Sequence, residues 1–211
     1  MNLIYRGAEA DVFRGRWCGL PAVFKFRKPL EYRLPKLDST IRGQRTVREA
    51  QMIHMAKEAG VRSPFLYYSS PSEALLVMED LGGTRLKAVL DDGGQRRLAS
   101  LAKMVGESVG KLHASGIMHG DLTTSNVLVG DSGEVGFIDF GLSVHTRRLE
   151  DQAVDLRLIK ETLTGAHNRA SKSFMRSLLE GYSAVLGKAR TEDAVGKLRE
   201  IERRGRYARV E

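Results

Sequence analysis

The chain has 211 residues, a hydrophobic fraction of 42% and a formal net charge of +8, with a pI of about 9.7. This length allows one large domain or two small lobes that share a cleft. No run of about 18 apolar residues occurs, so a transmembrane helix is not expected. The opening MNLIYRG lacks a basic segment followed by an apolar one, so we expect no signal peptide and a cytoplasmic location.

The composition also excludes a disulfide-stabilised scaffold. Cys18 is the single cysteine, so no intramolecular disulfide can form, which fits a reducing compartment. We expect Cys18 to pack as a small hydrophobic side chain.

Basic residues gather in two stretches. From Lys25 to Glu49, eight bases stand against three acids, and the last fifteen residues carry six bases against three acids. A single Lys or Arg is usually just a solvated surface group. Two clusters in one basic chain favour an acidic partner, and nucleic acid is the first candidate.

The first eighty residues predict a β-rich unit with one helix. Runs rich in apolar, aromatic and β-branched residues, separated by turn residues, indicate strands. Helical spacing of apolar residues before Gly60 indicates a helix from Thr40 to Ala59. The two prolines between Lys28 and Leu37 predict an irregular segment there. The predicted strands are Asn2–Arg6, Asp11–Trp17, Pro21–Arg27, Phe65–Ser69 and Ala74–Met78.

The character of the chain changes after Gly82 and Gly83, and Glu79–Gly83 is expected to be a hinge. Beyond it the pattern is mainly helical, with helices expected at Thr84–Leu90, at Arg96–Ser115 and from Leu149 onward. Two short strands, Val127–Val129 and Glu134–Ile138, are expected around a glycine-rich turn. The sequence contains no internal repeat and no low-complexity segment.

The segment from His119 to Ser143, HGDLTTSNVLVGDSGEVGFIDFGLS, carries the chemistry. Alone, Asp121 reads as a turn former, Asn126 as a cap and Asp139 as a bend. Together, with an apolar strand pair between them, they match the kinase signature H-x-D-x-x-x-x-N followed by D-F-G. Asp121 would orient or deprotonate the phosphoryl acceptor, while Asn126 and Asp139 would bind Mg²⁺, with Mn²⁺ as a possible substitute.

The same signature predicts a lysine on the third strand and a glutamate on the following helix. Lys25 lies in the apolar run Ala-Val-Phe-Lys, and a partly buried lysine needs a partner. Glu49 on the next helix is the best candidate, since Glu58 stands too near the helix end. The pattern as a whole predicts an α+β, bilobal protein kinase-like fold that binds ATP, with one lobe at residues 1–80 and the other at 81–211.

The turn that would cover the phosphates is unusual. Where a protein kinase has G-x-G-x-x-G, this chain has Gly7, Ala8, Glu9 and Ala10. Backbone amides could still approach a phosphate, but an acidic side chain beside a triphosphate is unexpected. Two interpretations of Glu9 stay open: it repels the nucleotide, or it holds Lys25 when the site is empty.

Position in the chain also predicts an adenine pocket. Val12 and Val23 would form its roof and Leu128 its floor. Met78 would lie at the back, and the backbone of Glu79 and Leu81 would meet the edge of the adenine. These residues would pack in the core with or without a nucleotide.

Over nearly its whole length the sequence resembles the small atypical kinase subunit of the KEOPS (EKC) complex, a relative of the RIO kinases. Gly7–Ala10 is similar to that family's replacement for the glycine-rich loop. The remaining similarity lies in Lys25 with Arg27, the stretch Tyr32–Asp38, the segment Arg48–Ala50, both signature motifs, Glu150–Leu156 and the basic tail from Arg203 to Arg206. Gln152, where the family usually has lysine, is a departure.

The resemblance implies serine/threonine kinase and ATPase activity that serves threonylcarbamoylation of adenosine in tRNA. It also implies docking beside the catalytic transferase subunit, with the basic clusters contacting tRNA phosphates. His119 is followed by Gly120 rather than arginine, and the segment from Gly141 to Glu150 is short. These features predict constitutive order and weak conventional peptide phosphorylation.

Three alternatives remain. A small-molecule phosphotransferase of the aminoglycoside or choline kinase type also uses H-G-D, but usually carries an aspartate pair in place of Asp139-Phe140-Gly141 and needs a larger helical lobe. A RIO-type kinase of ribosome assembly is expected to have an extra N-terminal module. A nucleotide-dependent scaffold would bind ATP without needing Asp121 for function.

Overall fold

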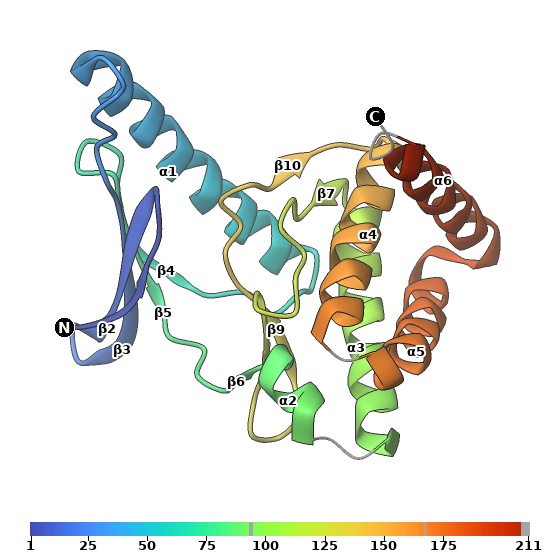
Figure 1. Ribbon diagram of the computed structural model, residues 1–211. Coiled ribbons are helices and arrows are strands. Elements are labelled where there is room, and N and C mark those ends of the chain that lie inside the picture. Colours follow the sequence, from blue (N-terminus) through green and yellow to red (C-terminus); the bar gives the residue numbers. More distant parts are fainter. Residues whose placement is uncertain (93–94, 167, 208–211) are drawn as a thin grey trace.

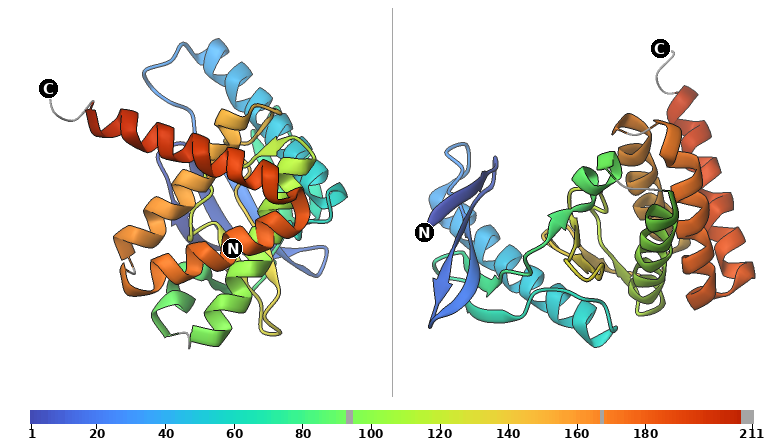
Figure 2. Two further views of the ribbon diagram at one scale, coloured as in Figure 1. Left: turned by 90° about the vertical axis from the view of Figure 1, so that its right-hand side faces the viewer. Right: turned by 90° about the horizontal axis from the view of Figure 1, so that it is seen from below.

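The computed structural model describes residues 1–92, 95–166 and 168–207. It has an N-terminal part built on a sheet and a C-terminal part built on helices, at opposite ends of the molecule (Figures 1 and 2). The predicted α+β, two-part kinase-like architecture is therefore confirmed.

The N-terminal part is a five-stranded antiparallel sheet in the order β1-β2-β3-β5-β4, with the long helix α1 packed against it. In the central strand β3, side chains alternate between the two faces of the sheet. Its pairing sets Lys25 opposite Val12 of β2 and Leu76 of β5. The elements are β1 Asn2–Arg6, β2 Ala10–Trp17, β3 Leu20–Arg27, α1 Pro35–Glu58, β4 Leu66–Ser70 and β5 Leu75–Glu79.

Within the described residues, the C-terminal part contains two small sheets, β6-β8-β9 and β10-β7, and five helices. Helices α3 and α5 pack most extensively, and α6 crosses beside α4 (Figure 2). The elements are β6 Thr84–Arg85, α2 Leu86–Asp92, α3 Gln95–Ala114, β7 Ile117–Met118, β8 Val127–Val129, β9 Val135–Phe137, β10 Val144–His145, α4 Leu149–Ala166, α5 Asn168–Leu186 and α6 Lys188–Tyr207.

One hydrophobic core joins the two parts. Buried Ile53 of α1 and Leu76 of β5 belong to the same cluster as Phe137 of β9 and Leu156 of α4. A smaller cluster centred on Phe24 lies on the other face of the sheet. There Trp17 stacks on Tyr68 with ring centroids 5.5 Å apart. The continuous core fixes the sheet relative to the helical part and so fixes the walls of the space between them.

Helix α1 begins at Pro35, five residues before the predicted start. The irregular segment expected up to Leu37 therefore ends before Pro35. Proline suits the first turn of a helix because the missing N–H would have no intrahelical partner there. Buried Asp38 stabilises the same turn, since it accepts hydrogen bonds from the backbone N–H of Leu30 and from Arg42 Nε, the latter at 2.6 Å.

Two other local expectations were wrong, and one pair of strands was missed. Thr84 and Arg85 form strand β6, which pairs with β8, so the helix expected from Thr84 begins at Leu86. The two-residue strands β7 and β10 pair with each other and were not predicted. Cys18 is exposed, because Cys18 and Gly19 form the tight turn between β2 and β3 with φ angles of 48° and 82°. Positive φ at both central residues is typical of a two-residue hairpin turn.

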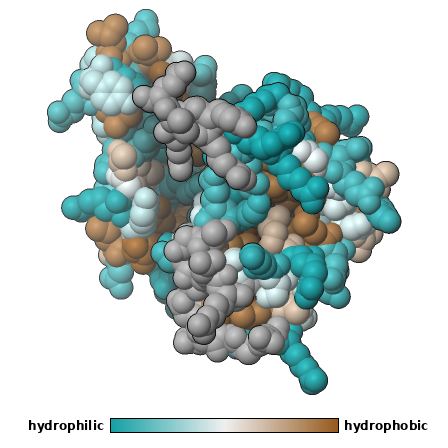
Figure 3. Space-filling model, turned by 45° about the vertical axis from the view of Figure 1, so that its right-hand side comes forward, coloured by the Kyte–Doolittle hydropathy of each residue, from teal (hydrophilic) through white to brown (hydrophobic). Residues whose placement is uncertain are grey.

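None of the helices within the described ranges is long and apolar enough to cross a membrane. The face shown in Figure 3, over the C-terminal helices, is predominantly hydrophilic. In α6, Arg204 pairs with Glu200 and lies 3.7 Å from Glu150 of α4. Residues 208–211 of the predicted basic tail lie outside the described residues.

Candidate active site

A cavity of about 460 Å³ lies between the sheet and the helical part. Most of the residues predicted for the site line it, although they come from distant stretches of the chain. They are Val12, Val23, Lys25, Glu49, Met78, Glu79, Leu81, Asp121, Asn126, Leu128 and Asp139. Gly7, Ala8, Glu9 and Ala10 are not among the lining residues, and Ile4 and Tyr5 of β1 lie there instead.

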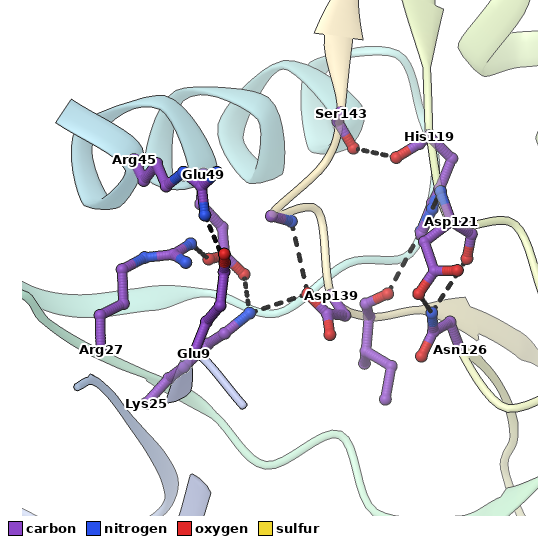
Figure 4. Close-up of polar contacts among 12 residues, drawn as sticks. Glu9, Lys25, Arg27, Arg45, Glu49, His119, Asp121, Asn126, Asp139 and Ser143 are labelled. Carbon is purple, nitrogen blue, oxygen red and sulfur yellow. Dashed lines mark hydrogen bonds and ion pairs between the residues drawn. The ribbon is translucent and has the colours of Figure 1, made fainter. Parts of the chain in front are cut away.

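Lys25 occupies the inner wall of the cavity. Its Nζ donates to Glu49 Oε1 at 2.7 Å and to Asp139 Oδ1 at 2.8 Å (Figure 4). Burial disfavours the charged amine, but the two carboxylates outweigh that effect, so the pKa of Lys25 is raised above its usual value. Lys25 therefore stays protonated at neutral pH.

Glu49 is held by a second cation. Arg27, two residues beyond Lys25 on the same face of β3, pairs with Glu49 Oε2. The side chains of Arg27 and Glu49 are 6% and 1% exposed, so both charges are removed from water. A buried charge needs a partner, and here one carboxylate on α1 serves two cations on β3. This arrangement fixes α1 against the sheet at the level of the cavity.

Asp139 faces the cavity from the helical part. Its side chain is 47% exposed. The partial burial of its carboxylate would by itself raise the pKa of Asp139. The neighbouring Lys25 reverses that effect and lowers the pKa of Asp139. The backbone φ of Asp139 is +62°, which is uncommon for a residue with a side chain. Phe140 is fully buried against His119, with ring centroids 4.8 Å apart, and secures this strained conformation.

Asp121 and Asn126 meet in the loop between β7 and β8. Asn126 Nδ2 donates to Asp121 Oδ2 at 2.8 Å and to the backbone oxygen of Asp121 at 2.9 Å. Because the amide nitrogen is used in this way, the amide oxygen of Asn126 is the atom that can serve a cation. Asp139 carboxylate and Asn126 amide oxygens are hard donors that fit Mg²⁺, which commonly takes one or two protein ligands beside phosphate oxygens.

The described residues contain no cluster of three or more His, Cys, Asp or Glu side chains suited to a metal ion. A site that depends on nucleotide phosphates for its remaining ligands needs no such cluster.

Asp155 of α4 holds the loop that carries Asp121, a role not predicted from the sequence. Its buried carboxylate accepts the backbone N–H of His119 at 2.6 Å and of Gly120 at 2.9 Å. It also contacts His113 Nε2 at 3.2 Å, and His113 Nδ1 lies 2.8 Å from the Tyr182 hydroxyl. The available signal was an aspartate surrounded by apolar residues within Glu150–Leu156.

Gly120 explains how the segment after Asp139 is ordered. A Cβ at this position would lie 2.3 Å from the backbone oxygen of Leu142, and the φ angle is +81°. The segment therefore packs directly on the loop, and Ser143 Oγ donates to the backbone oxygen of His119 at 2.7 Å (Figure 4). These contacts tie the segment to the loop.

Glu9 contacts neither the cavity nor Lys25. It pairs with Arg45 of α1 and lines a small separate pocket with Arg27, Lys28, Leu30, Arg33 and Arg42. The second interpretation from the sequence, a contact between Glu9 and Lys25, is therefore wrong for this structure.

Further lining residues were not predicted. Arg14 and Asp80 form an ion pair at 2.6 Å between β2 and the expected hinge. Asp80 also accepts the backbone N–H of Gly82 at 3.1 Å. Short polar residues of the loop line the cavity near Asp121, namely Thr123 and Ser125.

Comparison with known proteins identifies the family of the chain. Residues 26–168 match the family model described as protein kinase domain. The chain is 37% identical to the KEOPS complex subunit Bud32 of Pyrococcus abyssi, over 98% of this chain and 96% of that protein. It is 34% identical to the EKC/KEOPS complex subunit BUD32 of Yarrowia lipolytica, over 97% and 92%.

It is also 40% identical to a protein of Methanothermobacter thermautotrophicus named "Probable bifunctional tRNA threonylcarbamoyladenosine biosynthesis protein". That match covers 98% of this chain but only 36% of the relative, so the chain spans about a third of the longer protein. With its kinase domain and its full-length similarity to the two shorter relatives, the chain belongs to the Bud32 family of kinase-like KEOPS complex subunits.

Proposed function

We propose that this chain is the ATP-using subunit of a KEOPS complex and that it supports threonylcarbamoyladenosine modification of tRNA. The observation that carries the proposal is the convergence of Lys25, Asp121, Asn126 and Asp139 on one cavity. The names of the relatives from Pyrococcus and Methanothermobacter support the assignment to the complex and to the tRNA modification.

The cavity suits a nucleotide bound in the manner expected from the sequence. The adenine would lie between Val12 and Val23 on one side and Leu128 on the other, with Met78 at the back. Its edge would meet the backbone of Glu79 and Leu81. We place the division between the lobes at residues 80 and 81, directly beside this edge.

The charged residues would then act on the phosphates. Lys25 would contact the α- and β-phosphates, and Glu49 would keep it in place. Asp139 and Asn126 would hold Mg²⁺, which neutralises phosphate charge when bound. Asp121 would orient the attacking hydroxyl or water and accept its proton.

Both serine/threonine phosphorylation and ATP hydrolysis are compatible with this site. Hydrolysis is favoured by the short segment after Asp139, which offers little surface for a peptide. Ser143 and Gly120 tie this segment to the loop, so the site would be active without prior phosphorylation.

The partners follow from the family and from charge. The matched region of the Methanothermobacter relative is a third of a protein named bifunctional, which supports a close partner such as the threonylcarbamoyl transferase subunit. Exposed bases of the stretch Lys25–Glu49, such as Lys36 and Arg48, and the basic tail would contact tRNA phosphates, positioning the RNA without reading its sequence. We place this function in the cytoplasm.

Phosphate release from ATP tests the proposal. The purified chain is assayed alone, with the transferase subunit, and with that subunit and tRNA, beside an Asp121→Asn variant that keeps the shape of the side chain. We expect turnover to rise with the partner and tRNA and to vanish in the variant. ATP binding without turnover in any mixture would favour the scaffold, and transfer to an aminoglycoside or choline would favour a small-molecule kinase.

A further inference from the structure

The turn between β1 and β2, which the sequence predicts to cover the phosphates, carries the acidic side chain of Glu9. Its backbone is fixed by a hydrogen bond from Gly7 N to Ala10 O at 2.9 Å and by one from Lys28 N to the backbone oxygen of Glu9 at 2.8 Å. The backbone thus holds Glu9 in the turn, and the direction of its side chain decides whether a carboxylate faces the phosphates.

The side chain of Glu9 is directed towards helix α1. Figure 4 shows its carboxylate reaching Arg45, and the two groups form an ion pair. Glu9 is absent from the residues that line the large cavity and present among those of the small basic pocket. Arg45 therefore holds this negative charge in the small pocket and out of the lining of the large cavity.

Arg45 stands four residues before Glu49, so both side chains lie on one face of α1. Glu49 holds Lys25 and Arg27 of β3, and Arg45 holds the turn between β1 and β2. One face of the helix thus binds both the strand that carries Lys25 and the turn predicted from the sequence to cover the phosphates.

The other cations of the small pocket have carboxylate partners of their own. Arg42 pairs with Asp38 at 2.6 Å, and Lys28 lies 3.2 Å from Asp11. Among the described residues of this pocket, Arg45 is the cation that forms an ion pair with Glu9. Without Arg45, the Glu9 carboxylate would be free to turn towards the cavity, where it would repel a triphosphate.

We infer that Arg45 is a positioning residue for nucleotide binding, which holds Glu9 away from the phosphates of ATP and ties the turn to α1. The inference rests on the proposed ATP function. It explains why the turn tolerates an acidic residue. It also predicts that loss of Arg45 weakens the binding of a charged ligand and leaves the binding of an uncharged one the same.

The test compares the dissociation constants of Mg-ATP and adenosine by calorimetry for matched variants. We expect Arg45→Ala to weaken Mg-ATP binding about three- to tenfold, since the Glu9 carboxylate is partly exposed and partly screened. Adenosine has no phosphate, so its affinity is expected to stay the same. The loss for ATP is expected to shrink at high salt.

The double variant Glu9→Gln/Arg45→Ala separates repulsion from loss of structure. It lacks both charges, and we expect it to recover most of the lost ATP affinity. Arg48→Ala is the control for net charge, because Arg48 is exposed on the same helix and has no ion-pair partner among the described residues. We expect it to reduce ATP affinity much less than Arg45→Ala.

Three outcomes overturn the inference alone. They are unchanged ATP affinity in Arg45→Ala, a double variant as weak as Arg45→Ala, and equal weakening of adenosine and ATP, which would show that the loss is structural. If the unmodified chain binds neither ligand, the proposed function itself fails, and that result is distinguishable from the others.

Discussion

The Nζ atom of Lys25 lies 2.8 Å from Oδ1 of Asp139, although 114 positions separate the two residues in the chain. Lys25 belongs to the sheet and Asp139 to the helical part, so their ion pair closes the inner end of the cavity. In the proposed function, nucleotide binding would replace this contact with new ones for both residues. Lys25 would gain phosphate oxygens and Asp139 would gain the metal ion.

Removing either partner is expected to abolish productive ATP use. Lys25→Ala deletes the cation for the α- and β-phosphates, and Asp139→Ala deletes a metal ligand. We expect phosphate release to fall at least about a hundredfold in each variant. The rates of both purified proteins are compared with that of the unmodified chain, and turnover retained in both would refute the site assignment.

Glu49 is expected to matter more for stability than either of its cations. Glu49→Ala leaves Lys25 and Arg27 without their shared buried carboxylate, and breaking such a pair costs about 3–5 kcal/mol. Lys25→Met leaves Glu49 paired with Arg27, so we expect a smaller loss. Urea unfolding of both variants gives the order of the two losses, and equal or reversed losses would contradict the shared-carboxylate interpretation.

Asp155 is expected to control the loop that carries Asp121. Asp155→Asn keeps the size of the side chain but offers only one carbonyl oxygen to the two backbone N–H groups of His119 and Gly120. We expect the rate of phosphate release to fall about tenfold or more, with a smaller effect on ATP affinity. Asp151→Asn on the same helix is the control, because Asp151 contacts Thr146 and not the loop.

Gly120 is expected to tolerate no side chain. Gly120→Ala combines a positive φ with a Cβ atom 2.3 Å from the backbone oxygen of Leu142, so we expect a loss of about 2 kcal/mol or more. Gly133→Ala is the matched control, since its φ is +90° but nothing lies within 4 Å of the added atom. The free energies of unfolding should differ clearly, and similar values would show that the close approach costs little.

His119 is expected to make the fold sensitive to mild acid. Burial lowers its pKa, with nearby Asp155 opposing the effect only in part, so the folded state keeps the ring neutral. The unfolded chain binds a proton near pH 6.5, and stability therefore falls as the pH drops below that value, by at most about 1.4 kcal/mol per pH unit. The slope of unfolding free energy between pH 6.5 and 5 should be flatter in His119→Gln.

The Lys25–Asp139 pair has a different pH window. The raised pKa of Lys25 contributes stability that is lost only as the pH rises beyond its usual value of 10.5. The lowered pKa of Asp139 contributes stability that is lost only as the pH falls below about 3.8. Neither group should change the stability between pH 5 and 9, so a mild-acid slope belongs to other groups such as His119.

The cavity residues were predictable where a motif fixes them locally. Asp121 and Asn126 stand five residues apart in one loop, and Asp139 ends the following strand pair, so their spacing in the sequence already brings them together. Lys25 and Glu49 were predicted because the motif implies a lysine on the third strand and a glutamate on the following helix. The structure places all five on the cavity, and their chemical roles stay predictions.

The missed features depend on contacts between distant segments. Arg45 is 36 positions from Glu9, and Asp155 is 36 positions from His119; no local pattern joins either pair. Short strands such as β7 pair with distant segments, and two residues are too few to show the alternation of apolar and polar residues that indicates a strand. The two prolines predict an irregular segment from Lys28 to Leu37, but Pro35 lies in the first turn of α1, where proline suits the start of a helix.

The aromatic stack on the outer face of the sheet makes the protein convenient to follow by fluorescence. Trp17 is the only tryptophan, and it lies against Tyr68 and Phe24, away from the helical part. Its emission therefore reports melting of the sheet, whereas far-ultraviolet circular dichroism is dominated by the helices. Because one continuous core joins both parts, the two optical signals should change together in a single cooperative transition.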